Sequence, residues 1–196
     1  MLFRSWSKFQ QHAGQLIAIV AIVVAVNVVG SLLRFSIDSA RLGLLLAPVF
    51  WIVGQILAIG TLNAGLFITR GEAPEVGKVF STDRLGDYIG ATILFGIAVF
   101  IGLILCVIPG IVMAVMLSFY GYFVLDQNMS GMDALKASFD LVKSNGGNVI
   151  VVLIVAFVVN LVGLALCGVG MLVSAPVSQI MIAYAYKKLT GQAVAP

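Results

Sequence analysis

Four long stretches of the chain contain no Asp, Glu, Lys or Arg, and this feature limits the fold more than any other. They are Ala13–Leu33, Leu42–Thr69, Tyr88–Leu125 and Ser144–Tyr186. Charged residues make up 10% of the 196 residues, whereas a soluble domain usually has about 25%. Because so few charges cannot cover a water-facing surface, we expect most of the surface to face lipid. The sequence therefore predicts an all-α, polytopic membrane helix bundle, with a single integral membrane domain over residues 1–196.

The lengths of these stretches predict about six transmembrane helices. A helix that crosses the hydrocarbon needs about 20 residues, so the first two stretches fit one helix each and the last two fit a helical hairpin each. The hairpins are expected to break at Ile108-Pro109-Gly110 and at Gly168-Val169-Gly170. The predicted spans are 14–33, 45–68, 88–108, 110–126, 147–166 and 170–187. A re-entrant or tilted helix is the alternative for the fourth span, because its strictly apolar part is short.

The distribution of basic residues predicts the orientation. Two of them, Arg34 and Arg41, lie on one side of the predicted membrane. Nine lie on the side that holds both termini: Arg4, Lys8, Arg70, Lys78, Arg84, Lys136, Lys143, Lys187 and Lys188. Since cytoplasmic loops carry the excess of Lys and Arg, we expect both termini in the cytoplasm of a bacterium and the chain in its inner membrane.

Two parts of the chain match each other at a constant offset of 133 positions. Asn27-Val28-Val29-Gly30 aligns with Asn160-Leu161-Val162-Gly163, and Ser5-Trp6 with Ser138-Phe139. Both matches continue to an Ala-Pro step, at Pro48 and Pro176. We therefore expect three parallel repeat units, approximately 1–73, 74–131 and 132–196, each an interfacial helix followed by a hairpin. Duplication in a structural membrane protein is the simpler interpretation, and a transporter built of repeats is the alternative.

Amphipathic segments precede the hairpins. One face of residues 2–12 is apolar, and so is one face of residues 132–143, where Leu135 and Val142 oppose Lys136 and Asp140. Pro74 opens a third segment, in which Val79 and Phe80 are expected to face lipid. Such helices lie in the headgroup plane with the apolar side down. A docking surface for a cytoplasmic partner is the alternative.

The candidate functional residues are a few polar side chains inside or beside the spans. The intramembrane amides are Asn27, Asn160, Gln55, Asn63 and Gln179. An amide in hydrocarbon costs several kcal/mol unless it is bonded, so these side chains should face the bundle interior. Their simpler role is to join helices, and the alternative is to line a substrate path. Asp126 ends a span, where a solvated helix end is the simpler interpretation and a proton or cation role is the alternative.

Other chemistry has little support. Cys106 and Cys167 both fall near the predicted outer ends of spans, where two buried thiols are the simpler interpretation and a disulfide is the alternative. His12 has no second ligand beside it, so no metal or other cofactor is expected. We find no nucleophile motif, phosphate loop or paired acids, and therefore predict that the chain is not an enzyme. A net charge of +3 is too small and scattered for binding to nucleic acid.

Several motifs resemble a large group of uncharacterised bacterial integral membrane proteins. They include Ile108-Pro109-Gly110-Ile111, Ala134-Leu135-Lys136-Ala137-Ser138, Val142-Lys143-Ser144-Asn145, Gly168-Val169-Gly170 and Ala183-Tyr184-Ala185-Tyr186. That group is distantly similar to the membrane domain of some glycerophosphoryl diester phosphodiesterases. The resemblance implies an all-helical membrane domain without catalytic residues of its own. These 196 residues contain no phosphodiesterase domain, so we carry no such activity over.

The function expected from the sequence is that of a non-enzymatic integral membrane protein with an accessory, scaffold or lipid-associated role. Its expected partners are the bilayer and other membrane proteins. A small transporter or channel subunit, with a path lined by the buried amides, is the alternative. No small-molecule substrate is indicated.

Overall fold

The computed structural model describes residues 13–36, 40–81, 83–165 and 170–194, and it confirms the all-α fold class. Within these ranges no residue lies in a strand. The helices are α2 (Ala13–Ser36), α3 (Ala40–Arg70), α4 (Val76–Val79), α5 (Leu85–Leu105), α6 (Val107–Met116), α7 (Tyr120–Asp126), α8 (Gly131–Ala165) and α9 (Met171–Leu189). The predicted helix of residues 2–12 lies outside the described residues.

Four helical segments in the described part are long and apolar enough to cross a membrane. They are Leu45–Arg70, Leu85–Leu105, Val107–Asp126 and Gly131–Ala165, and a shorter apolar segment covers Ile17–Leu32. The predicted sixth span forms α9, which is not one of the four. Most of α9 is buried between other helices, so it does not need an apolar surface on every side. The number of membrane passes stays a prediction.

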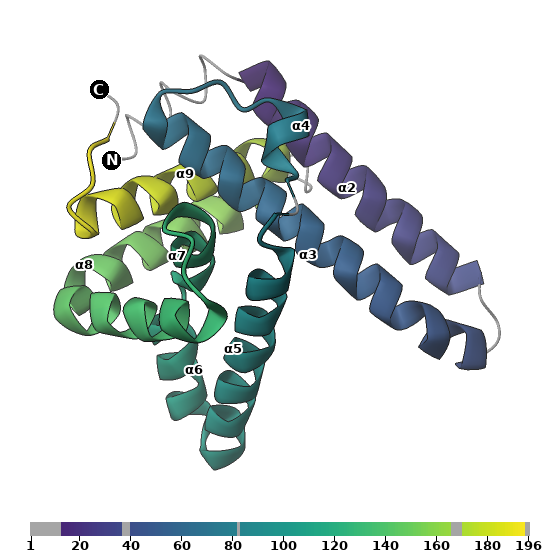
Figure 1. Cartoon of the computed structure of the whole chain (residues 1–196). Coiled ribbons are helices and arrows are strands. Elements are labelled where there is room, and N and C mark those ends of the chain that lie inside the picture. Colours follow the sequence, from purple (N-terminus) through teal and green to yellow (C-terminus); the bar gives the residue numbers. More distant parts are fainter. Residues whose placement is uncertain (1–12, 37–39, 82, 166–169, 195–196) are drawn as a thin grey trace.

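Helical hairpins project from a common core (Figure 1). The α2–α3 and α5–α6 hairpins point in different directions, and the second half of α8 runs beside α9. Large apolar side chains are exposed near the hairpin tips, including Leu32, Leu105, Ile108 and Leu164, and Leu105 is 75% exposed. Exposure of these apolar side chains to water would be unfavourable, whereas their exposure to lipid is favourable. Three successive hairpins follow the order of the predicted units, but the internal repeat itself stays a prediction.

Two clusters of buried side chains form the core, and α3 and α9 take part in both. The first cluster contains Ile59, Tyr88, Phe119, Tyr122, Val142 and Tyr186, among others, from α3, α5, α7, α8 and α9 and the turn before α7. The second gathers side chains of α2, α3, α4 and α9: Ile19, Ala64, Ile68, Val79, Val177, Ile180 and Tyr184. The core therefore lies towards the ends of α3 and α9 that carry the basic residues.

The predicted break between the third and fourth spans is displaced. Helix α5 ends at Leu105, and Cys106 alone, with an extended backbone (φ −174°, ψ 156°), separates it from α6. Pro109 lies in the first turn of α6. Backbone N–H groups in a first turn have no intrahelical acceptor, so a proline, which lacks the N–H, is tolerated there. Gly102 and Gly110 allow this tight connection, because a Cβ on Gly102 would lie 2.8 Å from the Gly110 Cα.

The fourth predicted span contains a second break, at residues 117–119 between α6 and α7. Ser138 of α8 satisfies the backbone at this break. Its hydroxyl donates to the Met116 carbonyl at 3.0 Å and accepts from the Phe119 N–H at 3.0 Å. The Ser138 side chain is fully buried. We call this pair of hydrogen bonds the Ser138 bridge.

The amphipathic segments pack on protein rather than only on a membrane surface. Leu135 and Val142 are buried in the core, while Lys136 and Asp140 are exposed. Helix α8 then bends at Asn145 (φ −127°, ψ 24°), as expected from the boundary between the predicted interfacial helix and the fifth span. Val79 and Phe80 were expected to face lipid, and this is wrong. Val79 is buried and Phe80 packs against α3, because Gly60 leaves room for the Phe80 ring.

We predict that Ser138→Ala lowers the free energy of unfolding by about 1–3 kcal/mol, because it leaves the Phe119 N–H and the Met116 carbonyl without this partner. Unfolding in mixed detergent micelles, followed by circular dichroism, measures the change. Ser144→Ala is the matched control, since the Ser144 hydroxyl bonds only to carbonyls of its own helix and to Asn145. Equal effects of the two substitutions would contradict the Ser138 bridge.

Candidate functional site

The most connected polar group among the described residues joins the basic ends of α3 and α9 to the carboxylate that ends α7. Lys187 of α9 donates to both Asp126 carboxylate oxygens, at 2.7 and 2.9 Å. Arg70, the last residue of α3, donates to the same carboxylate at 2.7 Å. The Lys187 ammonium also donates to the Gln192 side-chain oxygen. We call these four residues the Asp126 cluster.

The members of the Asp126 cluster differ in burial and therefore in their contribution to stability. The side chains of Asp126 and Lys187 are 3% and 6% exposed, whereas that of Arg70 is 41% exposed. The solvated helix end expected for Asp126 is therefore wrong. Removing one partner of a buried ion pair costs about 3–5 kcal/mol, because the other charge stays buried. An exposed guanidinium contributes less than about 1 kcal/mol. The Asp126–Lys187 pair is thus the part of the cluster that holds α7 on α9.

Aromatic and amide groups extend this contact. The Gln127 amide donates to the Tyr186 hydroxyl at 2.9 Å, and the Tyr122 hydroxyl donates to the Gln179 side-chain oxygen at 3.2 Å. The rings of Tyr122 and Tyr186 stack with their centroids 5.3 Å apart. Gln179, a predicted intramembrane amide, is thereby bonded between α7 and α9.

Asn160 is bonded across the α8–α9 contact. Its side-chain amide donates to the Ser178 hydroxyl at 3.0 Å and to the Ala156 carbonyl at 2.9 Å. Its side-chain oxygen accepts from the Ser174 hydroxyl at 3.3 Å. Both serines are buried, and Gly163 lies against Ser174 and Gly170 at the same contact. This arrangement joins two helices and leaves little free hydrogen-bonding capacity on Asn160.

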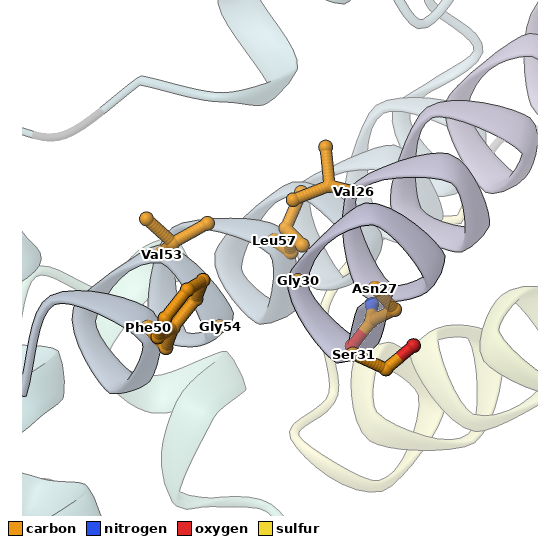
Figure 2. Close-up of a pocket in the computed structure, with 8 residues that line it drawn as sticks. All are labelled: Val26, Asn27, Gly30, Ser31, Phe50, Val53, Gly54 and Leu57. Atoms are coloured by element: carbon orange, nitrogen blue, oxygen red, sulfur yellow. The ribbon is translucent and has the colours of Figure 1, made fainter. Parts of the chain in front are cut away.

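Asn27, the counterpart of Asn160 in the sequence alignment, is exposed, so the expectation that it faces the bundle interior is wrong. Its amide donates to the Val23 carbonyl of its own helix at 2.7 Å, and its side-chain oxygen has no partner among the described residues. Figure 2 shows Asn27 and Ser31 close together on α2 beside the facing α3. They line a cleft of about 180 Å³ together with Val26, Gly30, Phe50, Val53, Gly54 and Leu57.

The different partners explain this contrast. The offset is 133 positions at Asn27 and Asn160 but 128 at Pro48 and Pro176, and in the second register Ser178 corresponds to Phe50. The hydroxyl that accepts from the Asn160 amide is therefore replaced by an aromatic ring in the first hairpin. The sequence alone predicts equivalent environments for Asn27 and Asn160, and the difference becomes visible only from the residues of the facing helix.

The remaining predicted residues lie apart from these contacts. The Asn63 amide donates to the Val79 carbonyl at 3.0 Å and holds α4 on α3. Gln55 is half-buried on α3, and its side chain makes no hydrogen bond within the described ranges. Cys106 is exposed at the α5–α6 turn. Cys167 and His12 lie outside the described residues, so the Cys106–Cys167 disulfide stays a prediction. Among the residues that the structure describes, no three His, Cys, Asp or Glu side chains are grouped to hold a metal ion.

Sequence reasoning missed three parts of the site: the Ser138 bridge, Lys187 as the partner of Asp126, and the serines around Asn160. One signal for Ser138 was present, since Ser138-Phe139 aligns with Ser5-Trp6 in the repeat. Lys187 was assigned only to the basic side of the membrane.

A family model with the description "Domain of unknown function (DUF7847)" matches residues 39–195. The chain belongs to the DUF7847 family. DUF7847 thus covers α3 to α9, including the Asp126 cluster and the Ser138 bridge. The family description names no activity.

Similar curated proteins come from mycobacteria. The chain is 35% identical over 132 residues to an uncharacterized protein of Mycobacterium tuberculosis, and to one of Mycobacterium bovis to the same extent. Each match covers 67% of this chain and 41% of the relative, so the chain spans about two fifths of the relatives' length. No solved structure matches the chain. Neither the family nor these relatives are described as part of a phosphodiesterase.

We predict opposite outcomes for Leu at the two aligned asparagines. Asn160→Leu should lower the free energy of unfolding by about 1–2 kcal/mol, because it removes the bonds to Ser174 and Ser178. Asn27→Leu should be neutral or slightly stabilising, because it removes an amide whose oxygen has no partner among the described residues. Unfolding of both variants in mixed micelles measures the difference. An equal loss in both variants would show that Asn27 also has an interhelical partner.

Proposed function

We propose that the chain is a non-enzymatic integral membrane domain of the bacterial cytoplasmic membrane that acts as a scaffold. The observation that most supports this proposal is that several polar side chains bond to neighbouring helices. The bonds of Asn160, Gln179, Ser138 and Asp126 all run between helices and hold the bundle together. They are arranged to fix helix positions rather than to bind a reacting molecule.

The transporter alternative has weaker support. A path would need polar groups facing one continuous opening. The cleft beside Asn27 has a volume of about 180 Å³, and a separate cleft beside Gln179 has about 80 Å³. These two clefts, which the predicted path residues Asn27 and Gln179 line, are small beside a typical ligand pocket of about 300–1,000 Å³. Asn160 lines neither of them.

The charge distribution supports cytoplasmic termini. Arg70, Lys187 and Lys188 lie at helix ends on one side of the core, and Cys106 lies at the α5–α6 turn on the other. Placing the first group in the cytoplasm satisfies the positive-inside rule. The resemblance to phosphodiesterase membrane domains remains a hypothesis from motifs, and we propose no activity from it.

Cys106 offers a direct test of this orientation. In a Cys167→Ser variant, we expect a membrane-impermeant maleimide to label Cys106 from outside spheroplasts. A cysteine introduced at Lys188, in a variant that lacks both native cysteines, should react only after permeabilisation. Labelling is read by mass shift on a gel. Labelling of Cys106 only after permeabilisation would overturn the proposed orientation.

A second experiment separates a scaffold from a transporter. We expect proteoliposomes that contain the purified chain to release ions and small solutes no faster than empty liposomes. We also expect defined membrane proteins to co-purify with the chain in a mild detergent. Solute release that falls in the Asn27→Leu or Gln179→Leu variant would support transport and contradict the scaffold proposal. The Asn63→Leu variant is the control, because its amide bonds α4 and lines neither cleft.

A further inference from the structure

The second half of α8 runs beside α9 (Figure 1). A cleft lies between the bend of α8 and the end of α9. Its volume is about 380 Å³, larger than that of either cleft described above. The polar part of its lining consists of Asn145, Asn148 and Lys188. The apolar part includes Val151, Val152 and Leu189. The lining thus changes from polar to apolar along α8.

The bend keeps this cleft open. Asn145 leaves helical geometry, and its side-chain amide donates to the Leu141 carbonyl at 3.1 Å and to the Ser144 hydroxyl at 3.2 Å. Gly146 and Gly147 follow, and a Cβ on either would meet no atom within 4 Å. The space beside Gly146 and Gly147 is therefore open. The Asn148 side chain is exposed in the cleft and makes no hydrogen bond within the described ranges.

Two adjacent lysines of α9 have different surroundings. The charge of Lys187 is neutralised by Asp126 in the buried pair. Lys188 is exposed, lines the cleft and forms no ion pair with any described residue. The exposed charges earlier on α8 include Lys143 as well as Asp140, so they do not give the cleft a negative balance. The cleft therefore offers one unneutralised ammonium beside two amides.

We propose that this cleft binds the phosphate of an anionic phospholipid. Lys188 supplies the positive charge, Asn148 supplies amide N–H donors, and the lipid's acyl chain lies along Val151 and Val152. This proposal rests on the proposed membrane placement, in which the bend of α8 and the end of α9 lie at the cytoplasmic headgroup level. Basic side chains at that level attract anionic lipids with about 1 kcal/mol each. A free phosphate would use the same polar groups but would leave the apolar wall uncovered.

The test uses the full chain, purified in a neutral detergent, and native mass spectrometry of retained lipid. We titrate dioleoylphosphatidylglycerol, dioleoylphosphatidylcholine and inorganic phosphate separately. We expect retention of phosphatidylglycerol over phosphatidylcholine and no competition by millimolar phosphate. Lys188→Gln should weaken phosphatidylglycerol binding about fivefold, because it removes the ammonium that lines the cleft and contacts the phosphate. Asn148→Leu should weaken it as well, without a change in net charge.

Lys143→Gln is the matched control, because it removes the same charge from an exposed lysine that does not line the cleft. It should leave binding within twofold of the unchanged chain. Equal losses in Lys188→Gln and Lys143→Gln, or equal retention of the two lipids, would overturn the proposal. Competition by inorganic phosphate at the same concentration would assign the cleft to free phosphate instead.

Failure of this inference is distinguishable from failure of the membrane proposal. A chain that shows the expected Cys106 labelling but no preference for phosphatidylglycerol contradicts only the lipid site. A chain that stays monodisperse in water without detergent contradicts the membrane placement, and the lipid site with it.

Discussion

Polar groups in an apolar helix bundle must find their partners within the protein, and this constraint accounts for most of the specific contacts in the structure. Lipid offers no hydrogen bonds, so an amide, a hydroxyl or a broken turn is most favourable where the protein itself supplies a bonding group. Asn160 is hydrogen-bonded to two serines and Gln179 to a tyrosine. The interrupted backbone between α6 and α7 is hydrogen-bonded to Ser138. In lipid the helices associate through close packing, and these bonds help to determine how they are arranged.

The charged groups at the basic end of the bundle are also paired within the protein. One carboxylate, Asp126, contacts cations from α3 and α9, and the more buried of the two cations has no other acid partner in the described part of the chain. A buried ion pair adds little net stability over an apolar pair of the same size, but it penalises any arrangement that separates the charges. The pair therefore acts mainly to select one position of α7 against α9.

Several parts of the fold follow from the sequence because they depend on local composition. The long helices include the charge-free stretches, and the bend of α8 at Asn145 falls where the amphipathic pattern gives way to a fully apolar one. The break near Pro109 was misplaced by a few residues, because proline is tolerated in the first turn of a helix and so marks a start as readily as an end.

The candidate site was less accessible to prediction. Polar positions can be found in a sequence, but whether they are bonded depends on the helix opposite. Asn27 and Asn160 occupy aligned positions, yet Phe50 faces one where Ser178 faces the other. Asp126 was expected in water because nothing in its neighbourhood along the chain identifies a lysine 61 positions away as its partner.

The Ser138 bridge also has a consequence for the order of biosynthesis. The break between α6 and α7 is complete in the nascent chain well before residue 138 leaves the ribosome. Until then the Phe119 N–H lacks the acceptor that it has in the finished protein. The α5–α6 hairpin and α7 therefore lack one of their backbone partners until the first part of α8 has been made. A segment that depends on the following helix in this way is not an independent module and would be poorly suited to expression on its own.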